Sequence, residues 1–395
     1  MKAIPQTREH FILIVVMISF LSISGTSAKE IPSHRFDKGP YAFSPNGSRL
    51  MTWNNGKGPG KLWDVKTGEL IKTLEGGNYK HGISNIVFSP NGKHFITTVT
   101  TRDITNPSGP LNIDEDVARL WNIESGKIIR TLNQKGPVAT AAFSPDGTTL
   151  LTGSGETYTN FDGVYDYYQN NARYNAGEIS LWDVITGNLI QVWPRINGAS
   201  IFSVGFSPDG EYLFFLSSIL GTGNVWQINP RKGILGFPLY QYAVVPEFSP
   251  NSNYLLYAND NHSLSLWNVK QPGIIRNFGD HQDTIRTLRF SPNGEMFLSS
   301  SEDGTVRLWS IYNEQAIGIL KGTAGEFSPD GNYILTGDWV LDANSGERIT
   351  DLPTTCSCFS PDGTHLLSET QDAIILWDIS AFISATRASH FMPYK

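Results

Sequence analysis

Short runs of apolar residues alternate with turn-forming residues along almost the whole chain. Leu150-Leu151-Thr152 and Tyr333-Ile334-Leu335-Thr336 are typical runs. Their β-branched and aromatic side chains favour β-strands. Between the runs stand sequences such as Ser-Pro-Asp-Gly and Thr-Gly, in which Pro fixes φ, Asp tolerates tight geometry and Gly permits positive φ. The pattern predicts an all-β chain of short antiparallel strands.

Two motifs recur together along the chain. Each repeat opens with Phe-Ser-Pro-(Asn/Asp)-(Gly/Ser), which begins at Phe43, Phe88, Phe143, Phe206, Phe248, Phe290, Phe327 and Phe359. An apolar-Trp-polar triplet follows, centred on Trp63, Trp121, Trp182, Trp226, Trp267, Trp309 and Trp377, with Leu341 at this position of the seventh repeat. Each repeat therefore predicts about four strands (a to d), a unit that buries both faces only by stacking on its neighbours.

These linked motifs resemble the WD-repeat (Trp-Asp) β-propeller family, and the Phe-Ser-Pro-Asp-Gly repeats suggest a bacterial-type exported member. The resemblance covers essentially residues 30–395. It implies an eight-bladed β-propeller of four-stranded antiparallel blades, with seven blades as the alternative. The eighth repeat lacks its last strand, and residues 30–36 are expected to supply it and close the ring, because closure removes an open sheet edge.

One repeat is closest to the family pattern. The resemblance implies a buried hydrogen-bonded network of His281, Ser299, Asp303 and Trp309 in the sixth repeat. The other repeats lack the full set, so we expect packing to hold their Trp side chains.

Two insertions interrupt the repeat. The spacing from motif Phe to motif Trp is 18–20 residues in five repeats, but 33 in the second and 39 in the third. The extra residues, roughly Thr101–Glu115 and Gly155–Ala176, fall between strands b and c. The resemblance implies that b–c turns and d–a loops share one rim, so the insertions are expected side by side. Long loops on rigid scaffolds are usually functional or disordered.

The second insertion holds five of the fifteen tyrosines of the chain. Tyr gives a large rigid contact area with a hydroxyl, and Arg can stack on aromatic rings. The predicted partner-binding residues are Tyr158, Phe161, Tyr165, Tyr167, Tyr168, Arg173 and Tyr174. The alternatives are that these side chains cover their own blade as a lid, or that the segment is disordered.

Other candidate chemistry is weaker. Acidic residues in the two insertions could meet around a hard cation, but no loop matches a calcium motif, so neither a metal nor a cofactor is predicted. The weak candidates are Asp114, Glu115, Asp116, Asp162 and Asp166. Cys356 and Cys358 are expected to fill a blade interface, with a strained disulfide or a soft-metal site as alternatives. His94 and His365 occupy a packing position on strand b, and no catalytic residues are assigned.

The N-terminus has the features of a secretory signal peptide. Lys2 and Arg8 precede an apolar run from Phe11 to Phe20, and small residues lead to a cleavage site after Ala28. We expect residues 1–28 to be removed and residues 29–395 to form a single propeller domain with no membrane span, secreted or periplasmic. The net charge of −7 argues against a nucleic-acid partner.

The sequence thus predicts an exported protein-binding scaffold that contacts a protein partner through the rim carrying the two insertions. One alternative is an exported propeller enzyme with a site in the central channel, resembling lactonases or quinoprotein dehydrogenases. The other is a non-catalytic propeller that binds a ligand or metal.

Overall fold

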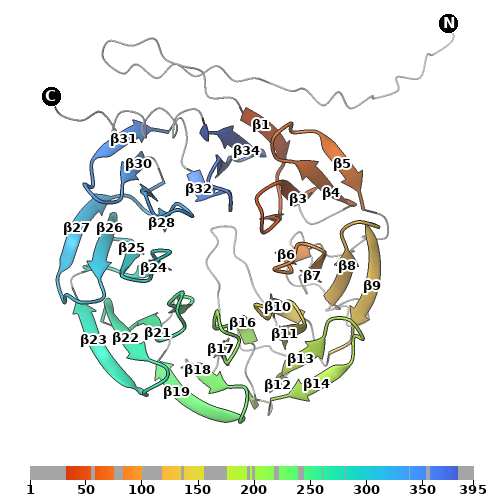
Figure 1. Cartoon of the computed structure of the whole chain (residues 1–395), viewed down its shortest axis with the longest axis horizontal. Coiled ribbons are helices and arrows are strands. Elements are labelled where there is room, and N and C mark those ends of the chain that lie inside the picture. The colour runs from red at the N-terminus through yellow and green to blue at the C-terminus, as the bar shows by residue number, and fades with distance from the viewer. Residues whose placement is uncertain are drawn as a thin grey trace, which may run out of the picture.

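The computed structural model describes residues 33–380 except 55–57, 75–82, 100–117, 135–137, 155–175, 194–195, 198–200, 218–221, 239–243, 260, 280, 338 and 353–355. The described residues form eight four-stranded antiparallel sheets arranged in a ring (Figure 1). In each blade strand a lies at the centre of the ring and strand d at its perimeter. The predicted eight-bladed all-β propeller is confirmed, and the seven-bladed alternative is wrong.

Blades are numbered here in chain order, with strands given from a to d. Blade 1 is β2 (Tyr41–Phe43), β3 (Arg49–Trp53), β4 (Gly60–Asp64) and β5 (Leu70–Thr73). Blade 2 is β6 (Ile83–Phe88), β7 (His94–Val99), β8 (Ala118–Asn122) and β9 (Lys127–Leu132). Blade 3 is β10 (Val138–Phe143), β11 (Thr149–Ser154), β13 (Ile179–Asp183) and β14 (Leu189–Val192). Blade 4 is β16 (Ile201–Phe206), β17 (Tyr212–Ser217), β18 (Thr222–Gln227) and β19 (Lys232–Pro238).

The remaining blades follow the same order. Blade 5 is β20 (Glu247–Phe248), β21 (Tyr254–Ala258), β22 (Ser263–Asn268) and β23 (Gly273–Gly279). Blade 6 is β24 (Ile285–Phe290), β25 (Met296–Ser301), β26 (Thr305–Ser310) and β27 (Ala316–Lys321). Blade 7 is β28 (Glu326–Phe327), β29 (Tyr333–Leu335), β30 (Trp339–Asp342) and β31 (Arg348–Asp351). Blade 8 is β32 (Cys356–Phe359), β33 (His365–Glu369), β34 (Ala373–Asp378) and β1 (Ser33–Asp37).

The ring closes as predicted, through an N-terminal strand. β1 pairs antiparallel with β34, with Ser33 opposite Trp377 and Asp37 opposite Ala373. Phe36 is buried, and its ring lies 5.0 Å from that of Trp63 in blade 1. The closing strand therefore completes blade 8 and also packs against blade 1.

The Phe-Ser-Pro motif makes the same turn between strands a and b in every blade. In blade 3, Ser144 Oγ donates a hydrogen bond to Asp146 Oδ1 at 2.6 Å and accepts one from the Thr149 N–H at 2.9 Å. Gly147 has φ of 70°, a region that favours glycine. Blade 5 has Ser252 there with φ of 58°, and its Oγ accepts a hydrogen bond of 2.9 Å from the Asp209 N–H in blade 4.

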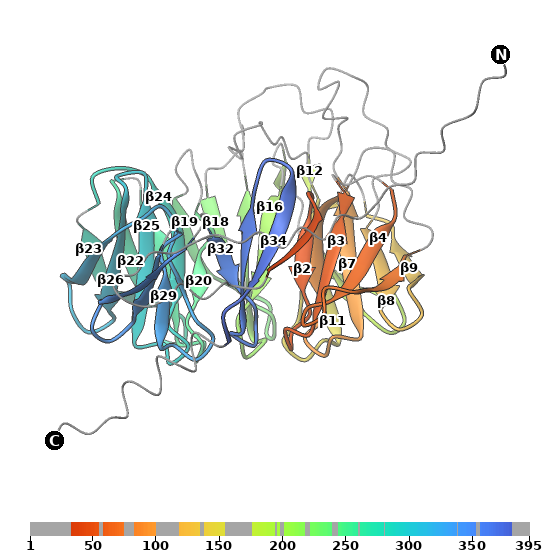
Figure 2. The ribbon, with the colours of Figure 1, turned by 90° about the horizontal axis from the view of Figure 1, so that it is seen from above.

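Adjacent a–b turns touch each other around the ring. A Cβ added to Gly294 in blade 6 would lie 3.3 Å from Cδ of Pro250 in blade 5, and one added to Gly331 in blade 7 would lie 3.4 Å from Cδ of Pro292. We call these eight turns, each the four residues that follow a motif Phe, the turn collar. They occupy the lower rim in Figure 2, and the b–c turns and d–a connections belong to the opposite rim.

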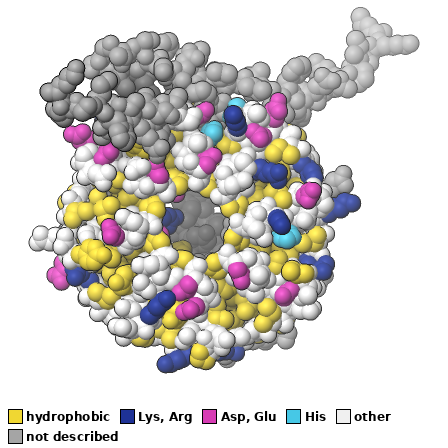
Figure 3. All heavy atoms as spheres, viewed as in Figure 1, with side chains coloured by type: hydrophobic (Ala, Val, Ile, Leu, Met, Phe, Trp, Pro, Cys, Tyr) yellow, Lys and Arg dark blue, Asp and Glu magenta, His cyan; other side chains and the backbone are white. Residues whose placement is uncertain are grey.

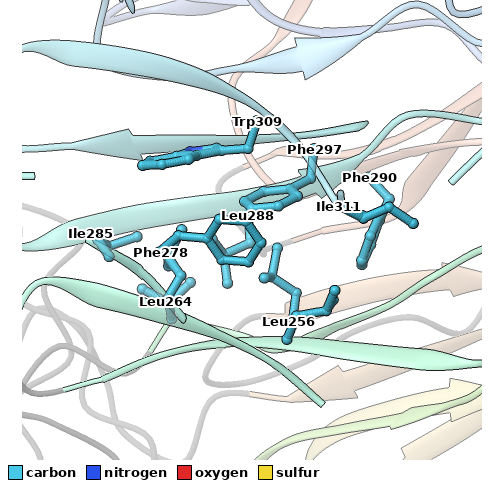
Figure 4. Close-up of a cluster of buried hydrophobic side chains, with 11 residues drawn as sticks. Leu256, Leu264, Phe278, Ile285, Leu288, Phe290, Phe297, Trp309 and Ile311 are labelled. Atoms are coloured by element: carbon cyan, nitrogen blue, oxygen red, sulfur yellow. The ribbon is translucent and has the colours of Figure 1, made fainter. Parts of the chain in front are cut away.

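The core lies between blades as well as within them. Figure 4 shows the cluster between blades 5 and 6, where the Phe297 ring stacks on Trp309 at 6.0 Å and Phe278 meets Trp309 edge-on at 5.5 Å. Leu256 and Leu264 of blade 5 complete it. Because such clusters join each blade to its neighbour, no blade buries its apolar faces alone.

Buried hydrogen bonds hold more of the motif Trp side chains than the sequence suggested. The expected network exists in blade 6: His281 Nε2 lies 2.7 Å from Ser299 Oγ, and His281 Nδ1 lies 2.8 Å from Asp303 Oδ2. However, the expectation that packing mainly holds the other Trp side chains needs a correction for four of them. Four more indole N–H groups donate to a hydroxyl on strand b at 2.8–2.9 Å, in the pairs Trp63–Thr52, Trp121–Thr97, Trp182–Thr152 and Trp377–Ser368.

Candidate functional site

The two predicted insertions lie almost entirely outside the described residues. This holds for all the predicted contact residues, Tyr158, Phe161, Tyr165, Tyr167, Tyr168, Arg173 and Tyr174, and for the acidic candidates Asp114, Glu115, Asp116, Asp162 and Asp166. The described strands place their attachment points. The first insertion leaves β7 after Val99 and enters β8 at Ala118, and the second leaves β11 after Ser154. Both therefore interrupt b–c connections of consecutive blades.

The attachment point of the second insertion is held firmly. The Ser154 N–H donates to the Glu178 carbonyl at 2.9 Å, and the Glu178 N–H donates to Ser154 Oγ at 2.9 Å, so strands b and c stay paired to their ends. Beyond this point Ala176 and Gly177 form β12 (Ala176–Gly177), which pairs with β15 (Ile196–Asn197) in the d–a connection. Figure 2 shows β12 at the upper rim of the ring. Ala176, expected to be the last inserted residue, is thus part of a short ribbon at this rim.

The two attachment points rest on one shared core. Ala118 and Leu120 at the start of strand c in blade 2 belong to the same buried cluster as Val138 and Trp182 of blade 3. Because both strand pairs pack on this cluster, the bases of the insertions are rigidly placed relative to each other.

A second site, missed by the sequence reasoning, lies on the innermost strands of blades 5 to 7. The ring is hollow at its centre in the view of Figure 3. The residue just before each motif Phe is small or apolar in the first four blades: Ala42, Val87, Ala142 and Gly205. The next three blades have Glu247, Arg289 and Glu326 there, and blade 8 has Cys358. The change at this one repeat position was a visible signal.

Each of the two carboxylates joins its blade to the next. Glu247 Oε1 accepts a hydrogen bond of 3.0 Å from the Phe290 N–H in blade 6, and Glu326 Oε2 accepts one of 3.1 Å from the Phe359 N–H in blade 8. These N–H groups belong to edge strands, which have no further strand to pair with. Arg289 Nη1 lies 3.6 Å from Glu247 Oε2 and donates to the Leu288 carbonyl at 2.8 Å.

Burial raises the pKa of both carboxylates on these innermost strands. Desolvation raises the pKa of Glu326 to about 7, although the Phe359 N–H and Arg289 oppose the shift and Glu247 reinforces it. The pKa of Glu247 is also raised by burial, against the opposing charge of Arg289. Acids with a perturbed pKa are candidates for function, but both carboxylates here already accept hydrogen bonds from backbone N–H groups.

The remaining candidates are structural. Cys358 packs against the cluster between blades 8 and 1, where the sequence placed it as a residue that fills a blade interface, and the side chain of Cys356 lies outside the described part of the chain. His94 and His365 start strand b of their blades, and burial lowers the pKa of both imidazoles. In the described residues no group of three or more His, Cys, Asp or Glu side chains could hold a metal ion. No helix in the described residues has the length and apolarity to span a membrane.

The ring of eight four-stranded blades, with its Trp–hydroxyl pairs, defines an eight-bladed β-propeller that carries WD40 repeats. The family described as "WD domain, G-beta repeat" matches residues 126–159 and 273–310. Residues 273–310 comprise strand d of blade 5 and strands a to c of blade 6, so the sequence repeat is offset from the blade by one strand. This offset is the reason that a terminal strand must close the ring.

Individual proteins are similar to this chain at a low sequence identity. Serine-threonine kinase receptor-associated protein from Homo sapiens is 24% identical over 230 residues, which are 52% of this chain and 63% of that protein. The Rattus norvegicus protein of the same name matches to the same extent. Protein tipD from Dictyostelium discoideum is 24% identical over 293 residues, 71% of this chain and 40% of that protein. The chain thus spans less than two thirds of the length of each of these relatives.

Proposed function

We propose that this protein is a non-catalytic scaffold that binds a protein partner through the b–c rim of blades 2 and 3. The observation that carries the proposal is the paired attachment of the insertions. Ser154 and Glu178 hold one base, and the β12–β15 ribbon extends blade 3 at the same rim. Binding residues are often found on loops that a rigid scaffold positions. The tyrosines and Arg173 of the second insertion have the chemistry of a contact surface.

The similar proteins support a binding role. The printed name of the human relative, serine-threonine kinase receptor-associated protein, describes an association with another protein. By contrast, Glu247 and Glu326 on the innermost strands already accept hydrogen bonds from neighbouring blades. This favours binding at the rim over catalysis in the channel.

The experiment is a loop replacement designed from the strand register. Since Ser154 and Glu178 are opposite each other, Asn-Gly in place of residues 155–177 closes a two-residue hairpin without shifting either strand. Partners are captured from extract of the source organism with wild-type and replaced chains, and each is then measured as a purified protein. We expect the affinity to fall at least tenfold while the melting temperature stays within a few degrees.

The matched control is Ile185→Ser, an exposed position in the c–d turn of the same blade at the opposite rim. This variant should bind as the wild type does. Equal affinity of the wild-type and replaced chains would exclude the second insertion as the contact. A large loss of affinity in Ile185→Ser would instead indicate that the partner contacts the other rim.

We also propose that the protein is exported. The support is the N-terminal pattern of Lys2 and Arg8, an apolar run and small residues before Ala28. Expression of the full chain in a secreting host should yield mature protein that begins at Lys29, as N-terminal sequencing reads it. Retention in the cytoplasm would contradict export, and an intact Met1 in the extracytoplasmic fraction would contradict cleavage after Ala28.

A further inference from the structure

The junction between blade 7 and blade 8 combines an apolar core with one carboxylate. Leu335 and Val340 of blade 7 pack against Phe359 and Trp377 of blade 8. At the channel end of the same junction Glu326 accepts the hydrogen bond from the Phe359 N–H. Blade 8 is the blade that β1 completes, so this junction lies beside the closure of the ring.

The surroundings of Glu326 are poor in compensating charge. On its own blade Leu335 lies opposite it in the strand register. β32 of blade 8 presents Phe359, which Cys358 precedes in the chain. Among the described residues, the charges that act on the carboxylate are Arg289 of blade 6, which favours ionisation, and Glu247 of blade 5, which opposes it. The positive charge of Arg289 also acts on Glu247, because Arg289 Nη1 lies 3.6 Å from Glu247 Oε2.

We propose that the junction between blades 7 and 8 is a pH-responsive seam, which tightens when Glu326 takes up a proton. In the closed junction the half-buried carboxylate of Glu326 has lost part of its contact with water, which is costly for the ionised form. The protonated acid still offers its carbonyl oxygen to the Phe359 N–H, so the bond across the junction survives. Opening the junction returns the carboxylate to water and therefore favours the ionised form.

The direction of the pH response follows from linkage. Burial raises the pKa of Glu326 to about 7, whereas an exposed Glu titrates near 4.3. Stability from this group is therefore fully present below about pH 4 and is lost as the pH rises through 7. Between pH 8 and pH 5.5 the opening constant of the junction should fall by about 30-fold.

The test uses the full chain and hydrogen exchange of peptides that cover β32, β34 and β1. Rates are corrected for the intrinsic pH dependence of amide exchange. In the wild type, protection should rise about 30-fold from pH 8 to pH 5.5. Glu326→Gln keeps the acceptor for the Phe359 N–H without the charge, so its protection should be nearly independent of pH.

Glu247→Gln is the matched control, because this residue has the same repeat position and bonds the junction between blades 5 and 6. It should retain most of the response in β32. A full response in Glu326→Gln, or no response in the wild type, would overturn the proposal. If Glu326→Gln does not fold, ¹³C NMR of the wild-type Glu326 carboxyl decides: a midpoint near 7 supports the proposal, and one below 5 refutes it.

Discussion

The four-residue network of blade 6 yields a quantitative prediction at Ser299. Its Oγ accepts the Trp309 N–H at 2.8 Å, and its proton is directed to His281 Nε2 at 2.7 Å. Burial lowers the pKa of His281, so we assign a neutral imidazole whose Nδ1 donates to Asp303 and whose Nε2 is an acceptor. Ser299→Ala leaves two buried groups, an indole N–H and an imidazole nitrogen, without a partner. At about 2 kcal/mol for each, the unfolding free energy should fall by about 4 kcal/mol.

Ser368→Ala is chemically the same change with half the consequence. Ser368 is as buried as Ser299, but among the described residues its Oγ has the Trp377 N–H as its one partner, at 2.9 Å. Its replacement should cost about 2 kcal/mol. Urea denaturation followed by Trp fluorescence and circular dichroism measures both variants under one set of conditions. Equal losses for the two variants would refute the reasoning, because the additional cost at Ser299 is attributed to His281 alone.

Three further predictions concern closure, a turn and a histidine. Phe36→Ala should lower the unfolding free energy by about 3–5 kcal/mol in urea denaturation, because Phe36 is buried against Trp63 at the closure, and a loss below 1 kcal/mol would argue against its role there. Ser252→Ala should lower the unfolding free energy by about 1 kcal/mol, because it removes the acceptor of the Asp209 N–H. Ser252→Gly should come within about 0.5 kcal/mol of the wild type, because relief of backbone strain at φ of 58° offsets that loss, and the reverse order of the two variants is inconsistent with this account. Burial lowers the pKa of His281, so ¹⁵N NMR should find its ring neutral with a titration midpoint below 6.5, whereas a midpoint above 6.5 contradicts the assignment. The contribution of His281 to the stability of the fold should be lost as the pH falls.

Much of the fold followed from the sequence because its information is local and repeated. The Phe-Ser-Pro turn depends on residues within six positions of one another, as the Ser144 bonds to Asp146 and Thr149 illustrate. Eight copies of this turn predicted eight blades, and the incomplete last repeat predicted a closing strand at residues 30–36, found at Ser33–Asp37. Neither inference required knowledge of contacts between distant residues.

The parts that the sequence reasoning missed depend on contacts across strands or blades. Thr52, Thr97, Thr152 and Ser368 all stand nine residues after the motif Phe, but only the b–c register reveals that each faces an indole N–H. Glu326 likewise bonds a residue 33 positions away in the next blade. For the predicted contact residues of the rim, such as Tyr167 and Tyr168, the described structure provides the base of the loop and not its surface.

The turn collar makes the two ends of the ring mechanically unequal. At one end each turn rests on the next, from Pro250 against Gly294 to Pro292 against Gly331, so a blade that tilts must push its neighbour. At the other end the connections vary in length from blade to blade, and no such chain of contacts is required by the repeat. A force applied there, by a docked protein or by tension, is therefore transmitted to the turn collar, whose contacts keep the blades from moving apart. A bound partner should alter the loops of its own rim and leave the spacing of the blades unchanged.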